Sequence, residues 1–467
     1  MERELVGKRP TFRPFRRRAN FYRILLWLGL ILLGTWLLLS LQRGQLRQPF
    51  MPTPTPTRTS QSYFLEAKAH FDAGKLDDPD PPAPTPPSPD AIDAFQRALE
   101  LDPNNGLAWA ELARIQAYSS SLLRNDAERT IRLAEAKRSA DRAVELAPDE
   151  STVRAIRAFV LDWYAFTLPN ERRVEILAEA ESEALRAYNL DTDNSLALAF
   201  YAEILVDQQK WNQARQYAEQ AVFLNENSMD THRAYAYVLE SWGEYNSAIQ
   251  QYKRAAEITP NLTFLYLQIG KLYREGIKNP DLALEYFARA AEINEQLGVQ
   301  NPNPFIEIAR TYTQLGEFFI AARNAEKALD LDPTNAITYA QLGSIFIRAR
   351  NYEGAMPLLK CAVQGCTATE NVRGAVTPLE LSNLTVAYYY VDYGTVLAFL
   401  SRPNENFCPE ARGVLAQVRT AYPEDPILIE IVNDSEGICR RLEGGTADTP
   451  AAAATSTPPA AANQASP

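Results

Sequence analysis

The chain has 467 residues, a net charge of −11, 46% hydrophobic residues, 31 prolines and two histidines. Residues 1–48 carry ten basic and two acidic residues, so the remaining chain carries −19. This acidic balance argues against a general nucleic-acid binder, which needs a basic surface. The sequence contains no HExxH, GxSxG, Walker-type or GxGxxG motif, so it predicts neither a catalytic residue nor a cofactor site.

The N-terminal region predicts one transmembrane helix. Residues 1–23 form a basic segment, and the run from Ile24 to Leu41 contains 18 residues without a charge. At about 1.5 Å per residue this run measures about 27 Å, close to the hydrocarbon thickness of a bilayer. A buried helix and a cleaved signal peptide remain alternatives, although no small-x-small cleavage motif follows Leu41. The positive-inside rule then places residues 1–23 in the cytoplasm and the rest of the chain outside the cytoplasmic membrane.

Residues 42–60 are rich in proline and threonine and predict an extended, semi-rigid linker. The chain that follows contains alanines seven residues apart, in the pairs Ala91/Ala98, Ala136/Ala143 and Ala180/Ala187. These pairs recur at intervals of 45 and 44 residues, which indicates repeated units with insertions. We expect the insertions in a proline-rich loop over 77–90 and near 119–125 and 167–173.

Between residues 196 and 362 a small residue recurs on a period near 34 residues, in the series Ala214, Ala248, Ala283, Ala321 and Ala355. Inside one unit, Phe305, Ile308, Ala309 and Tyr312 fall at i, i+3, i+4 and i+7, which indicates one apolar stripe of a helix. Pro333 ends that unit, because proline cannot continue a helix. Such a period predicts a row of stacked helix pairs and no single globular core.

This pattern resembles the tetratricopeptide repeat (TPR) family. In one unit the resemblance rests on Tyr339, Leu342, Gly343, Phe346, Tyr352, Ala355, Leu359 and Ala362. It implies a right-handed superhelix of helix pairs with a concave binding face. The sequence therefore predicts an all-α, TPR-type α-solenoid over residues 61–443, with about nine helix pairs and a capping helix at about 427–442. The predicted transmembrane helix precedes this solenoid, and the alanine-, proline- and threonine-rich residues 444–467 predict a disordered tail.

The resemblance also implies where a partner binds, because first-helix residues line the concave face in the TPR family. Carried over by position, these residues are Phe200, Glu203, Asp207, Arg233, Tyr237, Glu240, Lys271, Arg274, Glu307, Arg310, Gln314, Ser344 and Arg348. In the last three units Lys271, Arg274, Arg310 and Arg348 are cations in an otherwise acidic domain, so they could clamp an acidic peptide or a terminal carboxylate. The alternative is that they are ordinary solubilising charges, some of them paired with Glu275 or Glu307. The asparagine-and-lysine clamp of the chaperone-binding TPR proteins is not reproduced.

The four cysteines, Cys361, Cys366, Cys408 and Cys439, all lie in the last third of the chain. Their even number and clustering favour disulfides in an oxidising compartment. Cys408 and Cys439 lie about equally far from the turn at Pro423, so two antiparallel helices would bring them level. We therefore predict Cys408–Cys439, with Cys361–Cys366 pairing across a helix end. A structural zinc site and free buried cysteines remain alternatives.

Together these features predict a non-enzymatic scaffold that is anchored in the cytoplasmic membrane by one helix. Its TPR solenoid would bind a protein or peptide outside that membrane, without a cofactor or metal and without nucleic acid. One alternative is a TPR regulatory subunit of a membrane enzyme complex that faces the cytoplasm. Another is purely structural self-assembly through the ends of the solenoid.

Overall fold

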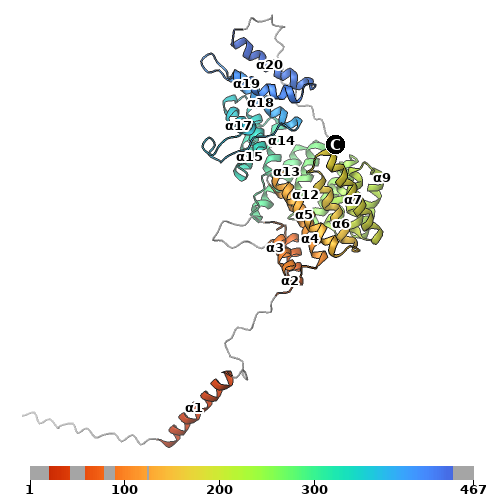
Figure 1. The fold of residues 1–467 in the computed structure, drawn as a ribbon, viewed down its shortest axis with the longest axis vertical. Helices are drawn as coiled ribbons and strands as arrows, with labels where there is room; N and C mark the ends of the chain where they lie inside the picture. Colours follow the sequence, from red (N-terminus) through yellow and green to blue (C-terminus); the bar gives the residue numbers. More distant parts are fainter. Residues whose placement is uncertain (1–19, 43–57, 78–89, 124–125, 445–467) are drawn as a thin grey trace, which may run out of the picture. The chain divides into compact units, whose positions relative to one another are not determined.

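The computed structural model describes residues 20–42, 58–77, 90–123 and 126–444, which fall into two units that divide between Arg58 and Thr59. In the first unit, α1 spans Phe21–Gln42 and is drawn in red (Figure 1). Within the described ranges, no helix combines the length and the apolar character that a membrane crossing requires. The structure therefore does not support the transmembrane helix predicted over 24–41.

The second unit consists of helices that pack in sequential pairs (Figure 1). The pairs are α2 (Ser60–Asp72) with α3 (Ala91–Leu101), α4 (Gly106–Ser119) with α5 (Asp126–Leu146), α6 (Ser151–Ala165) with α7 (Asn170–Leu190), α8 (Ser195–Asp207) with α9 (Trp211–Leu224), α10 (Met229–Ser241) with α11 (Tyr245–Ile258), α12 (Thr263–Lys271) with α13 (Pro280–Leu297), α14 (Asn303–Leu315) with α15 (Phe318–Leu331), α16 (Ala336–Arg348) with α17 (Tyr352–Gln364), and α18 (Leu384–Leu400) with α19 (Cys408–Ala421).

The last helix, α20 (Pro426–Leu442), packs on α18 and α19 at the end of the stack. A 3-10 turn, Ser120–Leu122, follows α4, and a π-helical turn, Leu272–Gly276, continues α12. In the part of the chain that the structure describes, the β-structure is confined to two isolated bridges, Cys366–Val376 and Arg402–Glu405. The prediction of an all-α solenoid is confirmed.

Small residues let the two helices of a pair approach closely. A Cβ atom placed on Gly270 of α12 would lie 2.4 Å from the ring of Phe287 on α13. In the same way, a Cβ on Gly343 would lie 2.6 Å from Leu359. Because real Cβ atoms do not come this near to a neighbour, a larger residue would force the pair apart.

Several of the turns inside the pairs share one backbone conformation. The left-handed region is occupied by Gly243 (φ 77°) and Gly316 (φ 81°) in two of these turns. In three others the corresponding residues are Gln209, Lys278 and Arg350, with φ of 61°, 61° and 59°. A residue with a Cβ is strained in this region, so these three turns store a small amount of strain that a glycine would release.

The long units near the start of the solenoid owe their length mainly to longer second helices. Both α5 and α7 have 21 residues, whereas α9 and α11 have 14. The expected insertions near 119–125 and 167–173 therefore correspond to short connections followed by about two extra helical turns. The predictions for residues 1–19, 43–57, 78–89 and 445–467 lie outside the described residues.

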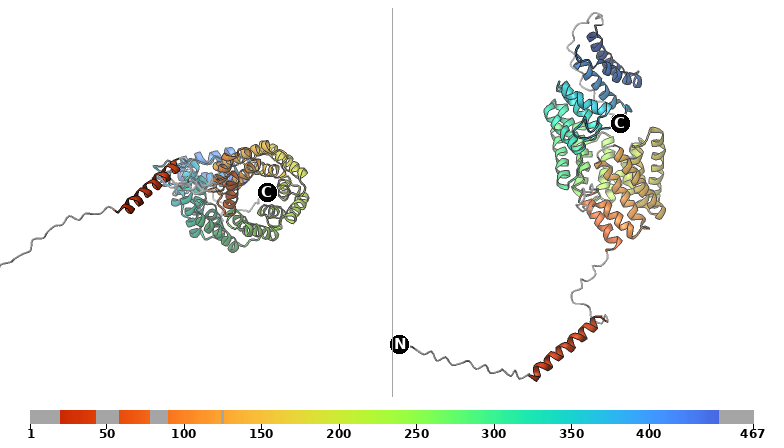
Figure 2. Two further views of the ribbon diagram at one scale, coloured as in Figure 1. Left: turned by 90° about the horizontal axis from the view of Figure 1, so that it is seen from below. Right: turned by 60° about the vertical axis from the view of Figure 1, so that its left-hand side comes forward.

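The pairs wind so that the first superhelical turn closes on itself, which is visible as the ring of orange to green helices in Figure 2. The amide of Asn261, just before α12, donates a hydrogen bond of 3.0 Å to the carbonyl of Ala73, 188 residues earlier. Asn303 at the start of α14 donates one of 3.4 Å to the carbonyl of Ser121. The C-terminal ends of α2 and α4 therefore lie beside the starts of α12 and α14.

Candidate binding surfaces of the inner face

Aromatic side chains fill the inside of the first superhelical turn. Tyr118 of α4 is fully buried, and its ring is stacked on Phe264 of α12 with centroids 5.4 Å apart. Phe159 and Trp163 of α6 approach the same ring to 5.2 and 5.6 Å. Helices from opposite sides of the ring thus meet at Tyr118, and the first turn has a packed interior where an open concave face was expected.

Charged side chains surround this ring and join α4, α8 and α10. We call Arg114, Tyr118, Glu203, Asp230 and Arg233 the closure cluster. Arg233 donates from Nε to the Tyr118 hydroxyl over 3.1 Å and forms an ion pair with Glu203 at 2.6 Å. Asp230 accepts hydrogen bonds from the Tyr118 hydroxyl and, at 2.9 Å, from Arg114. Each of these five residues is at least nine-tenths buried, so the cluster is closed to solvent.

Two further carboxyl groups extend the closure cluster along the inner face. Asp207 of α8 accepts a hydrogen bond of 2.6 Å from the hydroxyl of Tyr237 on α10. Asp162 of α6 is also buried, and the charges of Asp207 and Glu203 act on it. Burial raises the pKa of both aspartates, and it raises the pKa of Glu203 to about 7 against the opposing effect of Arg233.

The closure cluster changes the interpretation of several predicted binding residues. Phe200, Glu203 and Arg233 are 0%, 2% and 6% exposed, so they cannot line an open concave groove. Tyr237 is half-buried, and its hydroxyl is occupied by Asp207. At these positions the prediction of an accessible binding face is wrong, because the first turn winds tightly enough for its inner face to be covered by its own helices.

Arg274 is also a structural residue. It is 4% exposed, forms ion pairs with Glu307 at 2.6 Å and Glu275 at 2.8 Å, and donates a hydrogen bond of 3.2 Å to Thr311. It therefore ties α12 to α14. The prediction that it contributes an accessible cation to the groove is wrong.

Four other predicted residues are accessible. Arg310 and Gln314 on α14 and Arg348 on α16 are exposed, and Lys271 on α12 is half-buried. Arg310 lies 3.5 Å from Glu307 and keeps 47% of its side chain exposed. The structure thus separates the candidates into a buried group, most of it in the first turn, and an accessible group on α12, α14 and α16.

The accessible group lies on the first helices of three successive pairs, α12, α14 and α16. Within the described residues, no side-chain hydrogen bond or ion pair joins α14 to α16. By contrast, α16 is tied to α18 by a hydrogen bond of 2.5 Å from Ser344 to Asp392. Tyr389 of α18 packs against the cluster that holds Ala309 of α14 and Tyr339 of α16, and burial raises its pKa while the charge of Arg310 lowers it.

Asp392 of α18 accepts that hydrogen bond from Ser344, and the charge of Arg348 acts on it. It is half-buried, and burial raises its pKa to about 6, opposed by the hydrogen bond from Ser344 and the charge of Arg348. We call Arg310, Gln314, Gln341, Arg348 and Asp392 the open face. Its exposed charges are cationic, whereas its carboxyl group is half-buried.

The cysteines form the two pairs that the sequence predicts. Cys408 at the start of α19 is bonded to Cys439 near the end of α20, with Cα atoms 5.5 Å apart. Cys361 of α17 is bonded to Cys366, with Cα atoms 4.8 Å apart. The first bond fastens the terminal helix to the stack, and the second closes the beginning of the connection between α17 and α18.

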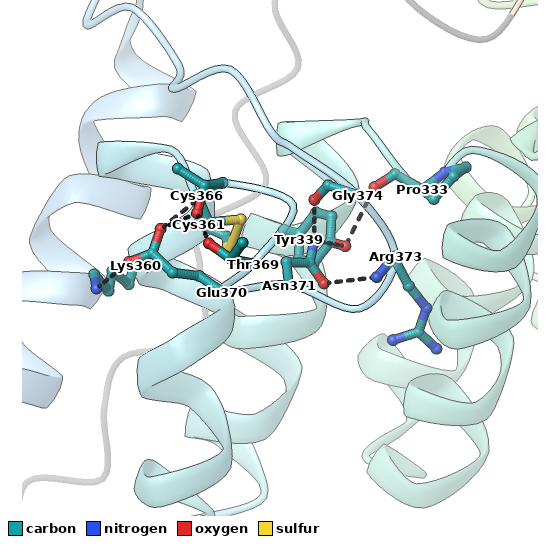
Figure 3. The surroundings of a disulfide bond; sticks show 11 residues. Pro333, Tyr339, Lys360, Cys361, Cys366, Thr369, Glu370, Asn371, Arg373 and Gly374 are labelled. Atoms are coloured by element: carbon teal, nitrogen blue, oxygen red, sulfur yellow. Dashed lines mark hydrogen bonds and ion pairs between the residues drawn. A yellow bond between two sulfur atoms is a disulfide. The ribbon is translucent and has the colours of Figure 1, made fainter.

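That connection, residues 365–383, is held in place at its tip (Figure 3). The side chain of Asn371 donates hydrogen bonds to the Tyr339 hydroxyl at 2.6 Å and to the carbonyl of Gly374 at 2.9 Å. Arg373 forms an ion pair with Asp330 of α15 at 3.1 Å. Val372, between them, is fully exposed, so the tip presents one apolar side chain on a fixed loop.

Arg114, Tyr118 and Asp162 are not among the binding residues predicted from the sequence. A signal for the first two exists, because Glu111, Arg114 and Tyr118 follow each other at i, i+3 and i+7 and form a polar stripe on an otherwise alanine-rich helix. Asp162 stands alone between Leu161 and Trp163 in an apolar helix, which is an unusual place for a carboxylate without a partner.

Comparisons with known proteins support the repeat assignment over part of the chain. No curated protein shows significant similarity to this chain. Among solved structures, a chain of the crystal structure of the APC/C hetero-tetramer Cut9–Hcn1 has a TM-score of 0.45 at 13% identity, over 64% of this chain and 52% of that one. This chain therefore spans about half of that relative's length.

A thermophilic TPR protein of Thermus thermophilus has a TM-score of 0.36 at 18% identity, over 46% of this chain and 99% of that one. Structural similarities of this magnitude give no information about function. The family models are more specific, since residues 202–262 match one tetratricopeptide repeat model and residues 265–297 match another. The stretch from α8 to α13 therefore carries tetratricopeptide repeats.

Proposed function

We propose that the chain is a TPR scaffold that binds protein partners, and that its open face receives an acidic peptide segment. The observation that carries the proposal is the contrast between the two parts of the inner face. The first turn is sealed by the closure cluster, whereas Arg310 and Arg348 stand exposed on neighbouring inner helices that no polar side-chain contact joins within the described residues.

The chemistry of the open face fits a carboxylate-rich ligand. A guanidinium group can form two parallel hydrogen bonds with one carboxylate, which gives direction as well as charge attraction. Gln314 and Gln341 add amide groups that can pair with the backbone of an extended peptide. The proposal assigns the chain binding and no catalysis, because its sequence lacks the motifs that nucleophilic, metal-dependent or nucleotide-dependent chemistry requires.

A titration monitored by fluorescence anisotropy tests this site. The probe is a labelled ten-residue peptide rich in Glu and Asp, and a Gln/Asn peptide of the same length is the uncharged comparison. We expect the acidic peptide to bind more tightly, and Arg310→Glu with Arg348→Glu to weaken binding by about tenfold or more, since two charge-assisted hydrogen-bonded contacts are reversed.

The matched control is Arg323→Glu on α15, an exposed arginine outside the open face. This variant changes the net charge by half as much as the double variant. The affinity for the acidic peptide should stay within about twofold, because an exposed charge outside the site acts on the peptide mainly through screened long-range attraction. Equal binding of both peptides, or an equal loss in the control and the double variant, contradicts the proposal.

We propose further that the chain is anchored by the run from Ile24 to Leu41 and that the solenoid lies outside the cytoplasmic membrane. The support comes from the sequence, where this run is uncharged and follows a basic segment. The large apolar side chains described in α1, among them Trp27 and Trp36, are exposed, so the described part of that unit offers no protein surface to cover them.

Carbonate extraction of membranes and protease treatment of intact cells and spheroplasts test the anchor and its direction. We expect the chain to stay with the membranes at high pH, and a protease added from outside to cleave the linker over residues 42–60. Release by carbonate contradicts the anchor. Cleavage only after lysis contradicts the outside location and favours a TPR subunit that faces the cytoplasm.

A further inference from the structure

We propose that the first superhelical turn is a proton-operated closure, which is tight when the carboxyl groups of Asp162, Glu203 and Asp207 hold protons and looser when all three are ionised. This inference does not depend on the proposed peptide site, because it concerns the sealed part of the inner face. We call these three residues the carboxyl triad.

Two parallel side-chain contacts join α8 and α10. Glu203 and Asp207 are four residues apart on α8, and Arg233 and Tyr237 are four residues apart on α10, so each pair lies on one helix face. Glu203 contacts Arg233 at 2.6 Å, and Asp207 contacts the Tyr237 hydroxyl at 2.6 Å. Glu203 is therefore paired with a cation of α10, whereas Asp207 contacts only a neutral hydroxyl group of that helix.

Asp162 adds a third carboxyl group from α6. It is 4% exposed, the charges of Asp207 and Glu203 act on it, and its Oδ1 atom has no hydrogen-bond partner among the described residues. Buried carboxylates that lie near each other repel when both are ionised, so a proton on one of them lowers the energy of the arrangement. A proton on one of these groups therefore favours the close packing of α6 on α8 at this level.

The groups that face the triad cannot neutralise it when it is fully ionised. Arg233 is the cation whose charge acts on both Asp162 and Glu203, and it also contacts Tyr118. Asp230 adds a further negative charge on the side of α10. The charged groups of α5 and α7 that reach α6 are already paired with its arginines Arg154 and Arg157; they are Asp141, Glu179 and Glu183.

Ionisation of the triad acts on the ring closure through Arg233. This arginine is the link between the triad and Tyr118, because it contacts Glu203 on α8 and the hydroxyl of Tyr118 on α4. Three carboxylates that repel each other push α6 away from α8. A wider angle between these inner helices increases the radius of the turn, which separates α4 from α10 at the closure cluster.

The direction of the pH dependence follows from burial. Burial raises the pKa of all three triad residues, that of Glu203 to about 7. A carboxyl group whose pKa is higher in the closed form than in the open form stabilises the closed form. This stabilisation is complete at pH values below the pKa that the group has in the open form. This contribution is lost as the pH rises through the pKa of the closed form. The closure should therefore be tight near pH 5 and should loosen from about neutral pH upward.

A distance measurement across the closure tests the proposal on the purified full chain. Spin labels attached through Arg97→Cys on α3 and Glu295→Cys on α13 report the separation of the two sides of the ring by pulsed electron spin resonance. The native cysteines are disulfide-bonded in the structure, so labelling is done without reductant. We expect a narrow distance distribution at pH 5 and a longer, broader one at pH 8.5.

Asp162→Asn with Asp207→Asn removes two charges and keeps groups that can hydrogen-bond to each other, so its distance distribution should stay narrow at both pH values. Asp162→Asn alone is a milder variant, and it should reduce the broadening at pH 8.5. The matched control is Glu171→Gln with Glu175→Gln, two exposed carboxyl groups on α7, which should follow the pH response of the unmodified chain.

A distribution in the unmodified chain that is the same at pH 5 and pH 8.5 overturns the proposal. So does a triad variant whose response equals that of the exposed control. Peptide binding at the open face plays no part in this measurement, and the two proposals can therefore fail separately.

Discussion

Tyr118 and Arg233 are separated by 115 residues in the sequence, yet the Nε atom of Arg233 donates a hydrogen bond of 3.1 Å to the Tyr118 hydroxyl. The same hydroxyl donates to Asp230, so one oxygen atom connects two charged side chains of α10 with α4. Contacts of this kind convert a row of locally packed pairs into a closed turn.

Tyr118→Phe should lower the free energy of unfolding by about 1–3 kcal/mol, because the ring stays in place while two buried charged groups lose a partner. Urea unfolding followed by circular dichroism gives the value. The control is Tyr266→Phe, whose hydroxyl bonds to the carbonyl of Pro260 at an exposed position and should cost less than about 1 kcal/mol. Equal losses in the two variants would mean that the closure cluster adds little to stability.

Gly394→Ala should destabilise the last pair, because the new Cβ would lie 2.6 Å from Leu415 on the facing helix. The cost expected for such overpacking is about 1–3 kcal/mol. Gly413→Ala in α19 is the matched change, since no atom lies within 4 Å of its Cβ position. It should stabilise the protein by about 0.5–1 kcal/mol through helix propensity. Thermal unfolding of both variants tests the opposite signs.

Replacing Gln209, Lys278 or Arg350 by glycine should raise stability by about 0.5–1 kcal/mol each. The strain of a left-handed residue is released, and part of this gain is offset by the greater chain entropy of glycine. The sites lie in different pairs, so the triple variant should gain roughly the sum. The reverse change, Gly243→Gln, should cost a similar amount at a position with open space around its Cβ. A melting temperature that is unchanged in the triple variant refutes the argument.

The Cys408–Cys439 bond closes a loop of 31 residues and the Cys361–Cys366 bond one of 5 residues. The loop-entropy model gives stabilisations of about 3–4 and about 2 kcal/mol. A reductant should therefore lower the urea midpoint of the oxidised protein. Cys408→Ala with Cys439→Ala should produce most of this loss without reductant. Mass spectrometry of peptides under non-reducing conditions identifies the bonds, and four alkylatable thiols in the native protein would show that neither bond forms.

The parts of the fold that depend on local pattern were predictable. The alanines at fixed intervals and the proline at Pro333 indicated the helix pairs, because close helix packing and helix termination leave signals within a single unit. Cys408 and Cys439 were placed together by counting from one turn. These inferences needed only the geometry of two neighbouring helices.

The closed turn was not predictable in this way. How far each pair rotates against the next depends on small differences in side-chain volume, and these accumulate over several pairs before α4 meets α10. Arg233 and Arg274 therefore looked like groove residues in the sequence. Their burial depends on partners, Tyr118 and Glu307, that lie on other helices. Arg310 and Arg348 stayed accessible because they follow the closed part.

The contacts across the ring also restrict where the chain can gain or lose a helix pair. Insertion or deletion of one helix pair between α4 and α10 would move Asp230 and Arg233 by a whole unit relative to Tyr118, so the two sides of the ring would no longer meet. The same change after α15 meets no such constraint. The number of helix pairs should therefore be constant between α4 and α10 and variable after α15. Duplicated pairs after α15 would lengthen only the part of the solenoid that ends with Cys408 and α20.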